Sequence, residues 1–132
     1  MGHGNWIKTL VAVGAFVATA SVAQAFETAK YEASAFKAAQ SAGTPILVHV
    51  TAPWCPTCTA QHKAINSLSD KADFAKVKIF DVDFDTQRDV WKGFSATTQS
   101  TLIAFKGTTE TGRLVGATSA KAIDALVQST LK

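Results

Sequence analysis

The stretch Ala52-Pro53-Trp54-Cys55-Pro56-Thr57-Cys58 contains both cysteines of the chain, spaced as Cys-x-x-Cys directly after a tryptophan. Two thiols at this spacing can close into one small disulfide ring and open again, which indicates redox chemistry. Covalent haem attachment is excluded, because it requires a histidine directly after the second cysteine, where this chain has Thr59. The motif therefore predicts a redox-active pair.

Two other interpretations of the cysteine pair stay open at this point. His62 follows Cys58 and His49 precedes Cys55, so a zinc site of two cysteines and two histidines can be written, although its spacing matches no standard zinc finger. A purely structural disulfide is the second alternative, but so short a loop removes little chain entropy from the unfolded state.

The first residues have the pattern of a secretory signal peptide. A short polar start precedes the apolar stretch 9–22, and Ala23-Gln24-Ala25 forms an A-x-A cleavage site. We expect 1–25 to be a cleaved signal peptide and 26–132 to be the mature domain. An uncleaved membrane anchor over 6–25 is the alternative, since that stretch approaches the ~20 residues that span a bilayer. Either topology puts the cysteines outside the cytoplasm, where disulfides persist.

Residues 26–132 have the length of one small domain, and no repeat or linker divides them. A domain of this size can bury one hydrophobic core without help from disulfides, which leaves the cysteines free for chemistry. The net charge is +3, but the lysines are scattered among aspartates, so no nucleic-acid partner is expected. We expect a monomer.

Apolar periodicity and turn residues predict helices that alternate with strands. An apolar run broken only by His49 is expected to be a strand covered on both faces, and Gly43-Thr44-Pro45 before it should end a helix. Ser119 should cap the last helix, and the turn-rich stretch 107–112 should join the last two strands. We expect helices at 28–42, 60–72, 87–94 and 119–131, and strands at 46–50, 77–82, 101–106 and 113–115. The expected fold class is α/β, with a mixed sheet sandwiched by helices.

This order of elements around Trp-Cys-x-x-Cys resembles the thioredoxin fold, a central mixed β-sheet flanked by helices. The specific matches are Pro45-Ile46-Leu47-Val48, the cysteine loop, Val82-Asp83 and the run from Thr101 to Gly107. The resemblance covers 26–132 and, with the signal peptide, implies a periplasmic single-domain thioredoxin-like protein. The helix followed by Gly-Thr-Pro also resembles the C-terminal domain of DsbD-type reductases.

The resemblance implies a division of roles between the two sulfurs. Cys55 should begin the second helix, where unpaired N–H groups and the helix dipole favour a thiolate, so it is expected to be the nucleophile. Pro56 suits the first helical position, and Cys58 should be the less exposed, resolving thiol. Trp54 should either shape a docking surface or be an ordinary core aromatic. Beyond the redox-active disulfide, no cofactor and no bound metal are expected.

The first departure from the family pattern is His49, at the strand position where thioredoxins carry a buried aspartate. That aspartate accepts a proton from the resolving cysteine, and His49 is a candidate for the same role. The alternative is a hydrogen-bonded core histidine without a catalytic part. Ile79 stands in the expected place of the buried lysine that often accompanies the aspartate, so the charge pair is expected to be missing.

The second departure is Ser100, which precedes Thr101 at the position of the family's cis-proline. A non-proline cis bond costs about 3 kcal/mol, so the loop should be either strained or trans with altered geometry. Ser100 adds an N–H and a hydroxyl near the sulfurs, with consequences for partner choice, for release of mixed disulfides or for metal binding by the cysteines. The expected substrate-binding residues are Trp54, Pro56, Ser100 and Thr101.

The expected function is that of an extracytoplasmic thiol-disulfide oxidoreductase, which exchanges electrons with protein thiols and disulfides as a reductant fed by a membrane thiol donor. Pro56-Thr57 resembles the dipeptide of thioredoxin-like reductases of cytochrome c maturation, although their central insertion is missing. An oxidant or isomerase is the alternative direction. The alternative class is a metal or metallocluster binding module that uses Cys55, Cys58 and His49.

Overall fold

The computed structural model describes residues 26–132, together with 2, 14, 15 and 18. The predicted signal peptide, 1–25, lies outside the described residues apart from these isolated positions, and so does its cleavage site. In the described part of the chain, every helix is too short or too polar to cross a membrane.

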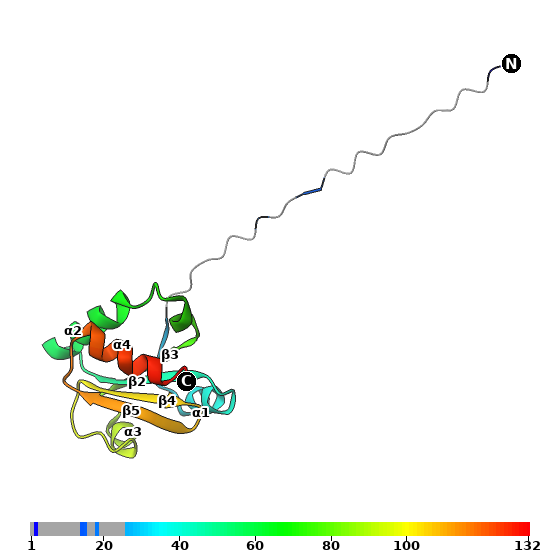
Figure 1. The fold of residues 1–132 in the computed structure, drawn as a ribbon. Helices are drawn as coiled ribbons and strands as arrows, with labels where there is room; N and C mark the ends of the chain where they lie inside the picture. Colours follow the sequence, from blue (N-terminus) through cyan, green and yellow to red (C-terminus); the bar gives the residue numbers. More distant parts are fainter. Residues whose placement is uncertain (1, 3–13, 16–17, 19–25) are drawn as a thin grey trace.

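A mixed sheet forms the centre of the domain. Its strands are β1 (Glu27–Lys30), β2 (Pro45–Thr51), β3 (Lys78–Asp83), β4 (Thr101–Lys106) and β5 (Thr109–Val115), in the order β1-β3-β2-β4-β5 (Figure 1). β1, β3 and β2 run parallel, β4 is antiparallel to β2, and β5 is antiparallel to β4. The helices are α1 (Ala33–Ser41), α2 (Pro56–Ser67), the 3-10 helix η1 (Ala72–Lys76), α3 (Arg88–Gly93) and α4 (Ala120–Ser129). The predicted fold class is confirmed.

Apolar side chains cover both faces of the sheet, as the continuous apolar run in β2 predicts. Leu47 packs among residues of α2, η1 and α4, whereas Ile46 and Val48 pack among residues of α1 and α3. Figure 1 shows α2 and α4 on one side of the sheet and α3 on the other. Because alternate residues of a strand share a face, His49 lies on the face of Leu47 and is directed towards α2.

The prediction of a single helix over 28–42 is wrong in its first part. Glu27–Lys30 form β1 at the edge of the sheet, and α1 begins only at Ala33. The side chains of β1 are mostly exposed, so backbone hydrogen bonds to β3 hold this strand and its sequence carries no apolar pattern. The helix end is as expected, since Gly43 follows α1 with a φ of +70°, which glycine adopts readily.

The hairpin of β4 and β5 is tighter than predicted. β5 begins at Thr109 rather than at 113, because Gly107, with a φ of +58°, takes part in a short turn. The polar residues after it pair with β4, up to Gly112 opposite Ala104. This part of β5 is exposed or half-buried and carries polar residues, and for that reason it resembles a loop in sequence.

On the face of Leu47, α2 begins before the predicted range 60–72, at Pro56, which was expected to be the first helical residue. α2 ends at Ser67, and η1, which was not predicted, places Phe74 in the core. The last helix follows its prediction, since the Ser119 side chain accepts a hydrogen bond from the N–H of Ala122. The buried residues of α4 are Ile123, Leu126 and Val127.

Phe80 offers a test of the core on the opposite face. It is fully buried in β3, and its ring meets those of Tyr31 and Phe36 edge-on. We expect Phe80→Ala to lower the free energy of unfolding by about 3–5 kcal/mol, because it removes a buried ring and leaves a cavity. Denaturant unfolding measures the loss. Val115→Ala, at an exposed position, is the control and should change stability by less than about 0.5 kcal/mol. Equal losses in the two variants would contradict this assignment of the core.

Candidate active site

The two cysteines lie at the start of α2, shortly after the end of β2. Cys55 is the N-cap residue of α2, Pro56 is its first helical residue, and Cys58 lies in its first turn. A disulfide joins Cys55 to Cys58, with their Cα atoms 5.3 Å apart. Both are buried, Cys55 with 3% and Cys58 with 1% of its surface exposed, so only a small edge of the disulfide is open to a partner.

The surroundings of Cys55 favour negative charge on its sulfur. The backbone N–H of Cys58 donates to Cys55 Sγ at 3.1 Å, as expected of an N-cap side chain. The positive end of the α2 dipole points at the same atom. A thiolate formed on reduction would therefore be stabilised by the backbone before any side chain contributes.

Ser100 supplies the side-chain contact to both sulfurs. Its Oγ lies 3.2 Å from Cys55 Sγ and 3.3 Å from Cys58 Sγ, in a buried position. Of the two expected loop geometries, the trans form is present: the described residues contain no cis peptide bond, and Ser100 has a φ of +61°. Its N–H donates to Val50 O at 2.8 Å and its carbonyl accepts from Gly116 N–H at 2.9 Å, which fixes this backbone.

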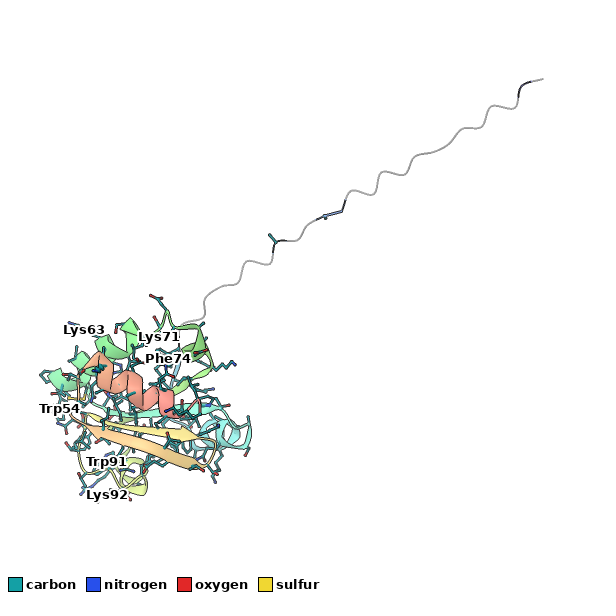
Figure 2. All side chains as sticks on the ribbon, viewed as in Figure 1. Trp54, Lys63, Lys71, Phe74, Trp91 and Lys92 are labelled. Atoms are coloured by element: carbon teal, nitrogen blue, oxygen red, sulfur yellow. A yellow bond between two sulfur atoms is a disulfide. The ribbon has the colours of Figure 1, made fainter. Side chains whose placement is uncertain are left out.

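Two other expected substrate-binding residues differ in exposure, since Thr101 is buried and Trp54 is exposed. Thr101 is buried, and its hydroxyl donates to Thr98 O at 2.8 Å, so its side chain forms a hydrogen bond within its own loop. Trp54 is 57% exposed and lies at the outer edge of the domain (Figure 2). Its Nε1 donates to Asp85 Oδ2 at 2.8 Å. The interpretation of Trp54 as a core aromatic is therefore wrong, and its exposed ring lies beside the cysteine loop.

The turn that carries Asp85 is held by a carboxylate. Asp83 Oδ1 accepts hydrogen bonds from the backbone N–H groups of Asp85 at 2.8 Å and Thr86 at 2.9 Å. These bonds, that of Thr86 first, lower the pKa of Asp83 because they stabilise its charged form. The indole of Trp54 thus binds to a turn with a fixed backbone.

His49 is completely buried and contacts neither sulfur through a hydrogen bond within the described residues. Its Nε2 lies 2.9 Å from Gln61 Oε1, and its Nδ1 lies 3.6 Å from Asp81 Oδ1. The strand register pairs His49 with Asp81 and pairs Leu47 with Ile79. Ile79 thus stands opposite Leu47, and the acidic residue beside His49 is Asp81, a contact that the sequence analysis did not predict.

Gln61 is the site residue that the sequence analysis missed. It is completely buried in α2, and its Nε2 donates to Ser100 O at 3.0 Å and to Ala117 O at 2.9 Å. Because both amide hydrogens are used, Oε1 is the atom that faces His49, and His49 Nε2 must be the donor. The available signal was a polar residue on the inward face of α2, one turn after Cys58.

In the structure, His49 and the two cysteines do not form a shared metal site. Among the residues that the structure describes, the grouping of ligand-type side chains consists of His49, His62 and Asp81, and it includes neither sulfur. The zinc and metallocluster interpretations of Cys55 and Cys58 with His49 thus gain no support from the geometry.

A disulfide at the N-terminus of a helix, on a mixed sheet of this order, is the arrangement of the thioredoxin fold. The family model described as Thioredoxin matches residues 27–129, and the chain belongs to the thioredoxin family.

Individual relatives agree with this assignment. The chain is 41% identical over 59 residues to the thiol:disulfide interchange protein DsbE of Vibrio cholerae, covering 45% of this chain and 27% of that protein. For the DsbE of Haemophilus influenzae the identity is 34% over 84 residues, or 62% of this chain and 42% of that protein. The chain thus spans less than half the length of these curated relatives.

Solved structures resemble the domain over most of its length. Trxlp from Edwardsiella tarda is 35% identical, with a TM-score of 0.73, and the match covers 76% of this chain and 98% of that one. A thioredoxin from Malassezia sympodialis is 19% identical, with a TM-score of 0.72 and a coverage of 84% and 96%, and shows the likeness of fold alone.

The contact of Ser100 with the sulfurs predicts an effect on thiol reactivity. We expect reduced Ser100→Ala protein to react with iodoacetamide at neutral pH about 10–100-fold more slowly, because a hydrogen bond to a charged acceptor contributes roughly 1.5–3 kcal/mol. The rate of alkylation of Cys55 measures this loss of thiolate. Ser67→Ala, which removes the hydroxyl that donates to Ala64 O on the same helix, is the matched control. Equal rates in the wild type and the Ser100→Ala variant would contradict the prediction.

The backbone conformation of Ser100 predicts that proline, the usual residue of the family at this position, is unfavourable in this chain. Proline requires a φ near −65° and has no N–H, whereas Ser100 has a φ of +61° and donates to Val50 O. We expect Ser100→Pro to lower the free energy of unfolding by more than about 1 kcal/mol. Ser100→Ala keeps the N–H and is the control in the same denaturation experiment. A proline variant as stable as the wild type would show that the loop does not need this conformation.

Proposed function

We propose that the protein is an extracytoplasmic thiol-disulfide oxidoreductase that reduces disulfides of other proteins. The observation that carries the proposal is the Cys55–Cys58 disulfide at the N-terminus of α2, with the Ser100 hydroxyl against both sulfurs. The exposed ring of Trp54 provides an apolar surface beside the disulfide on which a partner can dock. The printed name of the DsbE relatives, thiol:disulfide interchange protein, supports the same chemistry.

The reaction transfers two electrons through a mixed disulfide. The Cys55 thiolate attacks one sulfur of the partner's disulfide; that S–S bond breaks, a bond from Cys55 to the partner forms, and the other partner sulfur leaves and takes a proton. Cys58 then loses its proton and attacks Cys55 Sγ. The mixed disulfide breaks, the Cys55–Cys58 bond forms, and the partner is released as a dithiol.

Ser100 and His49 have separate parts in this scheme. The Ser100 hydroxyl can donate to whichever sulfur carries negative charge, since it lies close to both. His49 is a positioning residue, because its contact with the site passes through Gln61, which binds the Ser100 carbonyl. Direct proton transfer from Cys58 to His49 stays a prediction.

The proposal also specifies the direction of electron flow, from this protein to its partner. A reductant fed by a membrane thiol donor in the periplasm should have a potential near that of thioredoxin, about −270 mV, rather than near the −120 mV of strong oxidants. Equilibration of the Cys55–Cys58 couple with glutathione or dithiothreitol buffers measures this potential. A value near −120 mV would overturn the direction and leave the exchange chemistry intact.

Trapping of the mixed disulfide tests the proposed chemistry. We expect Cys58→Ser to accumulate a disulfide between Cys55 and a partner or model protein disulfide, because the resolving step is lost. Non-reducing electrophoresis and mass spectrometry detect the adduct. Cys55→Ser, the matched control, should form none. The proposal fails if the reduced wild-type protein does not reduce a model disulfide and the Cys58→Ser variant forms no adduct.

A further inference from the structure

Three side chains from different elements converge behind the cysteine loop. They are His49 from β2, Asp81 from β3 and His62 from α2, and one ligand-type atom of each lies within 4.8 Å of the others. The rings of His49 and His62 meet with their centroids 4.5 Å apart. Neither His62 nor Asp81 has a part in the thiol chemistry described above. We propose that these three residues form a binding site for a divalent transition-metal ion, best matched by Zn²⁺, that is separate from the redox cysteines.

The unsatisfied atoms of His49 and Asp81 are the first argument for this site. His49 Nδ1 and Asp81 Oδ1 are buried, and neither has a hydrogen-bond partner within the described residues. Because His49 Nε2 donates to Gln61, the neutral ring has its lone pair on Nδ1, directed at the carboxyl group. Two lone-pair atoms that face each other in a buried place are costly unless a cation lies between them.

The distances are the second argument. Ligands at 2.0–2.1 Å from a tetrahedral zinc ion are about 3.4 Å from one another. His49 Nδ1 and Asp81 Oδ1, at 3.6 Å, are already close to that separation. His62 needs only a small movement, and as a partly buried side chain whose Nε2 lies 3.4 Å from Thr51 Oγ1, it is not tightly held.

The surroundings also suit a metal ion. The Gln61 carbonyl accepts from the second nitrogen of His49, which is the usual outer-shell contact of a histidine ligand. A cavity of about 380 Å³, lined by His62, Asp81, Asp83 and Lys30 among others, gives access from solvent and room for a further ligand.

Two imidazoles and one carboxylate select the class of ion. This donor set is found in zinc sites that keep an open position and in non-haem iron(II) sites, whereas magnesium and calcium prefer oxygen ligands alone. The site differs from a metal bound by the cysteine pair, because it is complete while the disulfide is intact. It therefore does not depend on the proposed function.

Titration of the oxidised protein with Zn²⁺ alone tests the site. With Cys55 and Cys58 joined, the sulfurs cannot act as thiolate ligands, so calorimetry should show one ion bound per chain. We expect His62→Ala and Asp81→Asn each to abolish this binding, and the far-ultraviolet circular dichroism of each variant shows whether it is folded. Gln61→Leu, which removes the outer-shell contact, should weaken binding by about 10–100-fold.

Two outcomes would overturn the proposal. Absence of binding to the wild type, or binding that persists in folded His62→Ala and Asp81→Asn, would mean that a shared proton between His49 and Asp81 satisfies those atoms and that His62 is not a ligand.

Discussion

The hydrogen bonds of the Gln61 side chain hold the site together. One buried amide accepts from His49 in β2 and donates to the carbonyls of Ser100 and Ala117, so it joins three segments that are far apart in sequence. Each of these groups is buried or partly buried, and a lost partner would leave an unsatisfied polar atom at a cost of about 1–3 kcal/mol. The same bonds fix the donor nitrogen of His49 and the position of the Ser100 backbone. The contact between the Ser100 hydroxyl and the sulfurs depends on that position.

The family resemblance implies a carboxylate on the strand that precedes the cysteines. In this chain that position is His49, and the carboxylate is Asp81 on the neighbouring strand. An aspartate behind the resolving sulfur adds negative charge when ionised and opposes a thiolate, whereas a histidine is either neutral or positive. In this chain the carboxylate lies on the neighbouring strand, where it lines the cavity and is partly exposed. The carboxylate is thus on β3, and the residue at the family's aspartate position on β2 is an imidazole held by Gln61.

The sequence predicts well those features that depend on buried side chains, and less well those that depend on the backbone. The strand around His49, the cysteine loop and the last helix all follow from apolar pattern and capping residues. β1 was missed because an exposed edge strand is specified by main-chain pairing. The partner of His49 was missed for a related reason. A shift of two residues along β3 keeps the same face, so pattern alone does not distinguish Ile79 from Asp81, and only the register does.

Ser100 shows how a family position can change its residue without losing its place in the fold. A serine with a φ of +61° is an unfavourable backbone conformation, but its N–H and carbonyl are both bonded, to Val50 and Gly116, and the second carbonyl bond comes from Gln61. What the site gains is a hydroxyl that contacts both sulfurs, where proline offers only a steric surface. Because Gln61 binds Ser100 at one end and His49 at the other, the sulfurs and the His49–Asp81 pair are parts of one network. Substitutions at its two ends should therefore have non-additive effects on stability and thiol reactivity, since each changes the geometry of the shared amide.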